Sequence, residues 1–142
     1  MEAELEKIRA YFAADRYAAV SGIVIDFARE DCVQCSMEIG DLHKNAGREV
    51  QGGAIFTLAD FAFGVHSNFA RVSGRGDGRI VGQSCSISYF RQPKGKRLIV
   101  RSALLSGGRN VSVYRMSVSD ELGNPVAEMV GNGFTRHERN KA

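Results

Sequence analysis

The sequence predicts an α+β fold in which one long helix is wrapped by a curved antiparallel sheet. Residues 54–70 are largely apolar and contain no proline, which is typical of a buried helix. Strand-like segments precede and follow this helix, separated by turns rich in glycine or containing proline. A single long apolar helix must bury itself against such a sheet, and this favours an α+β layer arrangement.

The first half of the chain is expected to contain a helix and two strands before the long helix. Residues 3–16 carry apolar side chains at helical spacing among charges, which predicts an amphipathic N-terminal helix. Residues 21–29 are mostly apolar and residues 32–39 alternate apolar with polar side chains, so both segments predict strands. The polar segment 43–51 predicts a loop that leads into the long helix.

The second half is expected to be all strand after a glycine-rich connector at residues 73–78. The later strands are predicted over residues 80–90, 97–106, 110–120 and 126–136. Because short turns join them, we expect a meander in which consecutive strands pair. A charged tail follows from residue 136 to residue 142. A helix wrapped by a curved antiparallel sheet is the hotdog fold, and this fold is therefore the prediction.

Composition restricts the class of protein. The 142 residues suit a single domain, and 44% of them are apolar, which is ordinary for a globular protein. A net charge of +3 is too small to indicate nucleic-acid binding, and no apolar run is long enough to span a membrane. The start of the chain lacks the pattern of a signal peptide, so we expect a cytoplasmic protein.

The cysteines and histidines predict neither a redox site nor a metal site. Cys32 and Cys35 lie in a strand-like segment, where their spacing would place the two thiols on opposite faces. The histidines at positions 43, 66 and 137 lack the spacing of metal ligands. We expect His66 to be a packed core residue, and we expect no metal and no separate cofactor.

Two features near the centre of the chain point to a site for chemistry. Gly52 and Gly53 lie where the loop meets the long helix, and the first N–H groups of a helix have no intrahelical acceptors. Such a junction is a candidate pocket for a negative or developing-negative oxygen. Asp60 lies in the middle of the apolar helix, where a carboxylate is costly unless it is paired, protonated or solvated.

Two interpretations of Asp60 remain open. It shares one stripe of the helix with Thr57, Gly64 and Ser67, and this stripe could simply be the solvated face. Alternatively, Asp60 lines a pocket in which burial raises its pKa, so that it acts as a base or a nucleophile. Gly53 and Asp60 lie roughly 10 Å apart along the helix axis, too far to meet at one carbonyl. We therefore predict that a catalytic site would be shared between two subunits.

The segment from Asn45 to Phe63 resembles a family motif. Its pattern, Asn45-x-x-x-x-x-Gln51-Gly-Gly-x-x-Phe-Thr-Leu-Ala-Asp60-x-Ala-Phe, is similar to the central motif of hotdog acyl-CoA thioesterases of the phenylacetic acid degradation (PaaI-like) type. Ser88-Tyr-Phe-Arg-Gln-Pro93 resembles a later strand of the same family. The resemblance implies one hotdog thioesterase domain over residues 1–142, with its core at about 15–136.

The resemblance also implies an activity and an assembly. The activity would be hydrolysis of an acyl-CoA, with coenzyme A as part of the substrate, and the assembly a dimer at least and a homotetramer of two dimers. Asp60 would be the base or nucleophile, and the Gly53 N–H, with that of Gly52, would polarise the thioester carbonyl. Asn45, from the partner of the Asp60 subunit, would position water or the carbonyl.

The chain departs from the family pattern at two positions. Gln51 stands where the family commonly has histidine, and glutamine donates a hydrogen bond but does not transfer a proton near neutral pH. Gly82 stands where some relatives have a hydroxyl residue, with Ser84 following it. A non-catalytic acyl-CoA-binding module is therefore the alternative function. A hotdog dehydratase is disfavoured, because Asp60 and His66 face different ways on the helix.

Substrate contacts are expected along the helix stripe and at basic strand ends. The candidates are Gly52, Thr57, Gly64, Ser84, Arg91 and Arg109. The two arginines would contact the phosphates of CoA. The acyl group stays undefined, because the phenylalanines of the helix could shape an aromatic pocket or belong to the core: Phe56, Phe61, Phe63 and Phe69. The core is the favoured interpretation.

Overall fold

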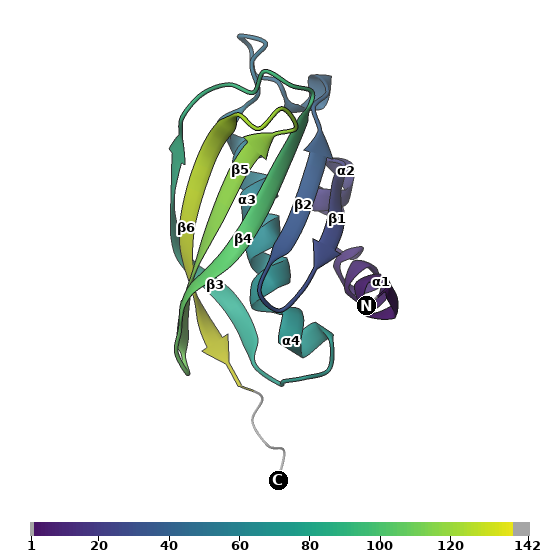
Figure 1. Cartoon of the computed structure of the whole chain (residues 1–142), viewed down its shortest axis with the longest axis vertical. Helices are drawn as coiled ribbons and strands as arrows, with labels where there is room; N and C mark the ends of the chain where they lie inside the picture. Colours follow the sequence, from purple (N-terminus) through teal and green to yellow (C-terminus); the bar gives the residue numbers. More distant parts are fainter. Residues whose placement is uncertain (1, 138–142) are drawn as a thin grey trace.

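The computed structural model describes residues 2–137 and shows a six-stranded antiparallel sheet wrapped around one central helix (Figure 1). The helices are α1 (Glu2–Phe12), α2 (Arg16–Val20), α3 (Gly52–Ser67) and α4 (Phe69–Val72), with a short 3-10 helix at Asp41–His43. The strands are β1 (Ile23–Ala28), β2 (Val33–Glu38), β3 (Arg79–Tyr89), β4 (Arg97–Gly107), β5 (Val111–Asp120) and β6 (Pro125–Arg136). Their order in the sheet is β1-β2-β4-β5-β6-β3. The predicted α+β class and hotdog fold are confirmed.

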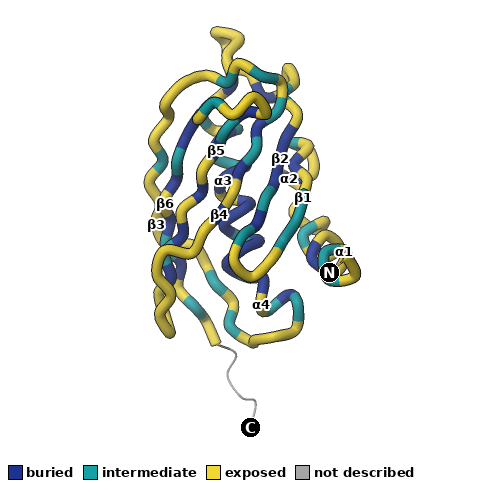
Figure 2. Tube along the Cα trace, viewed as in Figure 1, coloured by how far each residue is buried: buried dark blue, intermediate teal, exposed yellow. Residues whose placement is uncertain are grey.

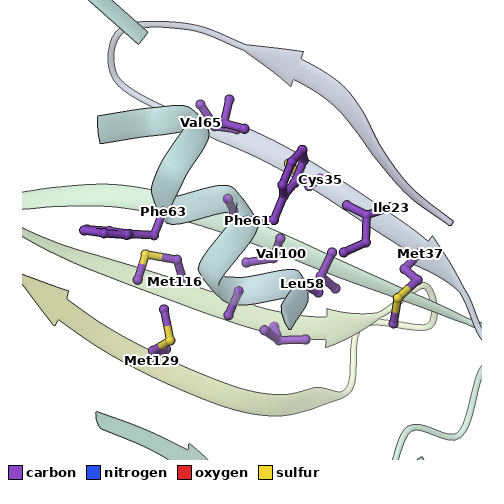
Figure 3. Packing of buried hydrophobic residues seen from close by; sticks show 14 of the residues in the cluster. Ile23, Cys35, Met37, Leu58, Phe61, Phe63, Val65, Val100, Met116 and Met129 are labelled. Atoms are coloured by element: carbon purple, nitrogen blue, oxygen red, sulfur yellow. The ribbon is translucent and has the colours of Figure 1, made fainter. Parts of the chain in front are cut away.

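The core lies between α3 and the inner face of the sheet. Leu58 and Val65 of α3 are 0% exposed. The central strands contribute Val100, Met116 and Met129, which are also fully buried (Figure 3). Every second residue of β5 is buried, as expected for a strand with one face toward the core. Figure 2 shows the result, with buried segments concentrated along α3 and the strands that face it.

The N-terminal helix expected over residues 3–16 is instead two helices. α1 ends at Phe12, and the Asp15 side chain then accepts a hydrogen bond from the Ala18 N–H at 3.1 Å, which caps α2. Aspartate favours a new helix start at this position because its carboxylate satisfies an otherwise unpaired N–H group. No described helix is long and apolar enough to cross a membrane. Residues 138–142 of the expected charged tail lie outside the described residues.

The expected meander is wrong for β3. Strands β4, β5 and β6 pair consecutively, but β3 pairs with β6 at the edge of the sheet, and β4 pairs with β2. The connection from β3 to β4 therefore crosses one end of the sheet, which is the upper end in Figure 1. Short connections usually join neighbouring strands. Here the connection at residues 90–96 binds to the turn between β5 and β6 instead of forming a hairpin.

Asp120 holds this crossover in place. Its carboxylate accepts hydrogen bonds from the Lys94 and Gly95 N–H groups of the crossover, at 2.9 and 3.1 Å. It also accepts from the Leu122 and Asn124 N–H groups of its own turn, at 3.0 and 2.9 Å. Burial alone would raise the pKa of Asp120, but the hydrogen bonds from Asn124, Lys94 and Gly95 hold that pKa well below its usual range. One carboxylate thus joins two turns.

His66 is a buried core residue, as the sequence predicts. Only 5% of it is exposed, and its Nε2–H donates to the Glu30 carbonyl at 2.9 Å. Nδ1 lies 2.8 Å from the Ser102 hydroxyl, and it accepts from this hydroxyl when the ring is neutral. Burial lowers the pKa of His66, although the Glu30 hydrogen bond and the Asp31 charge oppose this shift.

Stability is therefore expected to fall at acidic pH through His66. A group whose pKa is lower in the folded state contributes stability that is fully present above its unfolded value, 6.5, and is lost as pH falls through the folded value. We expect the free energy of unfolding in urea to drop more in the native protein than in His66→Gln between about pH 7.5 and about pH 5. Equal losses in the two proteins would show that His66 is not the titrating group.

Candidate active site

The long helix expected over residues 54–70 runs from Gly52 to Ser67, so both glycines of the junction lie in its first turn. The N–H groups of the next two residues donate to the Gln51 carbonyl, at 3.0 and 3.3 Å. Among the described residues, the Gly52 and Gly53 N–H groups have no acceptor. Helix starts commonly leave such groups unpaired. Both amides are available to an oxygen atom of a ligand.

Tyr89 and Gln92 fix the position of this junction, and the sequence analysis singled out neither. The Tyr89 hydroxyl donates to the Gly52 carbonyl at 3.0 Å, and its ring would lie 3.1 Å from a Cβ at position 52. This close approach favours glycine at position 52. The Val50 N–H donates to Gln92 Oε1 at 2.8 Å, and Gln92 Nε2 donates to the Val50 carbonyl at 3.1 Å. Both residues belong to the segment 88–93 that resembles a later strand of the family, and this resemblance was the signal that could have identified them.

Asp60 lies at a cavity of about 270 Å³ between α3 and the strands β3 and β6. Phe56 and Phe63 line the cavity with it, because they lie one turn before and one turn after Asp60 on the helix. The strands contribute the opposite wall: Gly82, Gln83, Ser84, Cys85, Met129 and Gly131. Two of the phenylalanines that the sequence assigned to the core thus also border the carboxylate.

Burial raises the pKa of Asp60 above its ordinary value of 3.8, and the negative charge of Asp15 adds to this shift. Asp60 is exposed in the single protomer, and part of the cavity wall beside it is apolar. A carboxylate with a raised pKa is a stronger base. Asp60 thus lies at the cavity and is also exposed to solvent in the protomer, which fits both interpretations from the sequence.

The other residues of the Asp60 stripe form a hydrogen bond, are buried, or leave open space beside the helix. The Thr57 hydroxyl donates to the Gly53 carbonyl at 2.8 Å, within the first turns of the helix. Gly64 is half-buried, and a Cβ at this position would meet no atom within 4 Å. Ser67 is buried at the end of the helix. The protomer thus leaves open space one turn beyond Asp60.

Ser84 belongs to a polar network on the strand side of the cavity. Its hydroxyl donates to Asn132 Oδ1, and Asn132 Nδ2 donates to Gln83 Oε1 at 3.0 Å. A bulge between Gly82 and Ser84 inserts Gln83 into the strand. A Cβ at Gly82 would lie 3.4 Å from the Phe63 ring. Gln83 lines the cavity beside Asp60 and accepts a hydrogen bond from Asn132, and the sequence analysis singled out neither residue.

Asn45 and Gln51 lie near the start of α3. Asn45 Oδ1 accepts from the Glu49 N–H at 3.1 Å, and the Asn45 carbonyl accepts from the Arg48 N–H at 2.9 Å. Asn45 therefore shapes the turn that precedes the helix. The Gln51 side chain extends beside Gly53, since its Oε1 would lie 3.3 Å from a Cβ at position 53.

Arg91 and Arg109 lie at opposite ends of the sheet. Arg91 follows β3, at the end where α3 begins. Arg109 lies in the turn between β4 and β5, beside the start of β3. A single protomer does not bring these two predicted phosphate contacts together.

A second cavity, of about 400 Å³, lies between α1, α2 and β1 and is mostly apolar. None of the site residues that the sequence predicts lines it. Within residues 2–137, no group of three histidine, cysteine, aspartate or glutamate side chains is placed to hold a metal ion.

Known proteins are similar to this chain in sequence and in fold. The family model described as "Thioesterase superfamily" matches residues 50–127, a segment that contains Gly52, Gly53 and Asp60. A Deinococcus radiodurans protein named "Putative esterase" is 30% identical over 131 residues, which are 91% of this chain and 85% of that protein.

A mutant of the phenylacetic acid degradation protein PaaI from Thermus thermophilus is 26% identical, with a TM-score of 0.75 over 84% of this chain and 98% of that chain. A mutant thioesterase from Pseudomonas aeruginosa has the same fold, with a TM-score of 0.83 at 17% identity over 94% of each chain. The chain belongs to the thioesterase superfamily.

Proposed function

We propose that this protein is an acyl-CoA thioesterase that hydrolyses a CoA thioester to a free acid and CoA, at a site shared by two subunits. Membership of the thioesterase superfamily supports thioester hydrolysis in general. One observation carries the finer proposal. Asp60 lies at a partly apolar cavity on a helix whose first two N–H groups, at Gly52 and Gly53, are free.

The proposed reaction uses these groups in two roles. The Gly53 N–H, with that of Gly52, donates to the thioester oxygen and stabilises the negative charge that develops there. Asp60 accepts a proton from water while the water oxygen attacks the carbonyl carbon. The C–S bond then breaks, and the CoA sulfur leaves as a thiolate that takes up a proton.

A nucleophilic role for Asp60 is the alternative within the same site. Its carboxylate would attack the carbonyl carbon and form an anhydride, which water then hydrolyses. A single turnover in oxygen-18 water, followed by mass spectrometry, tests the nucleophilic route. Label in the Asp60 side chain indicates an anhydride that water opens at the aspartyl carbon. Label in the released acid alone indicates attack of water on the acyl carbon, which both routes allow.

The edge strand β3 supports assembly into a dimer. Its residues from Val81 to Ser86 are exposed, and within residues 2–137 no strand pairs with its outer edge. A long unpaired edge is a template for a second copy of the chain. Gly53 and Asp60 lie roughly 10 Å apart on one helix, so a partner helix is what would bring the two groups to one carbonyl. We propose a dimer as the minimal form and a tetramer of two dimers as the full assembly.

Mixing two inactive variants tests the shared site. Asp60→Asn removes the base, and Gly53→Pro removes a free N–H without removing a hydrogen bond of the protein. In a mixed dimer, one shared site carries both changes and the other carries neither, so co-expression is expected to restore activity. Circular dichroism controls for the folding of each variant, and light scattering for dimer formation. A co-expressed protein as inactive as either parent would contradict the shared site.

The acyl group is proposed to enter the cavity beside Asp60. Phe56 and Phe63 line about 270 Å³ there, which suits a compact apolar or aromatic group. The Thermus relative is named for phenylacetic acid degradation. We expect phenylacetyl- and hydroxybenzoyl-CoA to turn over faster than medium-chain esters, with thiol release followed by DTNB. Faster turnover of the medium-chain esters would contradict this assignment.

Asp15→Asn is expected to move the acidic limb of the pH–rate profile to lower pH. The negative charge of Asp15 raises the pKa of Asp60, so its removal keeps Asp60 deprotonated at a lower pH. Asparagine also caps helices, so α2 should persist. The measurement is kcat/KM against pH for both proteins. A limb that stays in place would show that Asp15 does not act on the catalytic group.

Gln51 favours a second candidate function, a non-catalytic acyl-CoA-binding module. It replaces the histidine that is common in the PaaI-like pattern, so a proton donor is missing beside Gly53. This function predicts tight binding of CoA esters with negligible turnover. Rapid thiol release from any ester of the panel would exclude it.

A further inference from the structure

The peptide unit that joins Gly52 to Gly53 has a hydrogen-bond donor bound on one side and a free donor of its own on the other. Its carbonyl oxygen, which belongs to Gly52, accepts a hydrogen bond from the Tyr89 hydroxyl at 3.0 Å. Its N–H group, which belongs to Gly53, has no acceptor within residues 2–137. Because resonance couples the carbonyl and the N–H of a peptide, a change at one group is felt at the other.

The two groups of this unit point in opposite directions, because the peptide is trans. A ligand oxygen that binds the Gly53 N–H therefore approaches from the side away from Tyr89. The phenol and a substrate do not compete for space at this peptide. The hydrogen bond from Tyr89 can thus persist while a thioester is bound.

The absence of a side chain at position 52 gives the Tyr89 hydroxyl access to the carbonyl. A Cβ there would lie 3.2 Å from the phenol oxygen and 3.1 Å from the ring carbon that bears it. A carbonyl oxygen has two lone pairs, so it can accept from Tyr89 in addition to the helical N–H four residues on. The contact lies within one protomer and does not depend on assembly.

The neighbouring Gly52 N–H belongs to a peptide without such a side-chain donor. The carbonyl of that unit, at Gln51, accepts from the N–H groups of Ala54 and Ile55, at 3.0 and 3.3 Å. These are backbone contacts of the kind that any helix start provides. The two free amides of the junction therefore differ, because a hydroxyl group stands behind the amide of Gly53 alone.

We propose that Tyr89 polarises the Gly52–Gly53 peptide and makes the Gly53 N–H the stronger of the two donors to the thioester oxygen. This inference rests on the proposed function and goes beyond a role for Tyr89 in placing the helix start. Hydrogen bonds that are linked through a peptide strengthen one another, by about 10–30% per bond. The thioester oxygen gains its negative charge in the transition state, so the benefit is largest there. Tyr89 is thus a positioning residue that acts through Gly53.

Tyr89→Phe removes the hydroxyl and keeps the ring beside Gly52. One oxyanion donor contributes about 100- to 1,000-fold to kcat, so a donor weakened by about 10–30% predicts a kcat lower by about two- to eightfold, with KM nearly unchanged. Tyr11→Phe is the matched control, because Tyr11 is 48% exposed and Tyr89 is 50% exposed. The Tyr11 hydroxyl bonds to Arg71 of α4, beyond the other end of α3. We expect native kcat from this control.

Two further measurements separate polarisation from placement. Replacing Tyr89 alone by monofluorotyrosine or difluorotyrosine gives successively stronger donors of nearly the same shape. We expect kcat to rise in that order at a pH where each phenol stays protonated. In the free protein, labelled with nitrogen-15 glycine, the Gly53 amide proton should move upfield in Tyr89→Phe and downfield in the fluorinated proteins. The Gly52 amide proton should move less.

Two results would overturn the proposal. One is native kcat in Tyr89→Phe. The other is a loss of kcat in this variant while neither kcat nor the Gly53 amide shift follows the acidity of the fluorinated phenols, which would show that the hydroxyl only holds the helix start in place. The proposed function fails separately, if the native protein hydrolyses no thioester. The Gly53 amide shift then still decides whether Tyr89 polarises this peptide.

Discussion

Asp60→Asn is expected to lower the rate of thioester hydrolysis by at least about 100-fold, the lower end of what a general base contributes. Asparagine has nearly the same shape but neither accepts a proton at neutral pH nor attacks a carbonyl as a carboxylate does. The fold should persist, because Asp60 is exposed to a cavity and its side chain holds no hydrogen bond within residues 2–137. The measurement is kcat by thiol release, together with the melting temperature.

Asp31→Asn is the matched control for this change. Its side chain is 84% exposed and lies in the turn between β1 and β2, remote from the start of α3. We expect native turnover from this variant. Native turnover from Asp60→Asn as well would end the proposal that this carboxylate performs the chemistry, whatever the assembly.

Leu58→Ala is expected to reduce the free energy of unfolding by about 2–5 kcal/mol. Leu58 is 0% exposed in the middle of α3 and packs between the helix and the sheet (Figure 3). Its truncation removes buried apolar surface and leaves a cavity that the surrounding strands fill only in part. Urea unfolding measures the change, at equal protein concentrations because dimer formation would add to stability.

Leu122→Ala isolates the effect of burial in that experiment. Leu122 loses the same atoms, but it is 67% exposed in the turn between β5 and β6. We expect its stability to stay within about 0.5 kcal/mol of the native value. Similar losses for the two leucines would mean that α3 is not packed as the structure shows.

Local patterns were sufficient for the element types and for the fold. The apolar run of α3 and the alternation of β2 and β5 are periodic features, and periodicity reports which face of an element is buried. The partner of β3 was not predictable in this way. The crossover that follows β3 is anchored by Asp120, which accepts hydrogen bonds from the Lys94 and Gly95 N–H groups, 26 and 25 residues away. The break after Phe12 likewise depends on one cap, at Asp15.

The candidate site was visible where the sequence breaks its own pattern. Asp60 interrupts an apolar helix, and two glycines interrupt the loop before it, so both stood out. Tyr89 and Gln92 follow the pattern of a strand and a turn and did not stand out. Their role lies in hydrogen bonds to backbone groups that are 37 and 42 residues away, and no local signal reports such contacts.

The carboxylate of Asp120 accepts hydrogen bonds from backbone amides on two separate turns. If either turn opens alone, this buried carboxylate loses half of these hydrogen-bond donors. The amide protons of Lys94, Gly95, Leu122 and Asn124 should therefore exchange with deuterium at similar rates, as one cooperative unit. This unit also anchors the segment from which Gln92 reaches Val50. Local melting at this end of the sheet would thus loosen the start of α3, and slow exchange there would report a rigid junction.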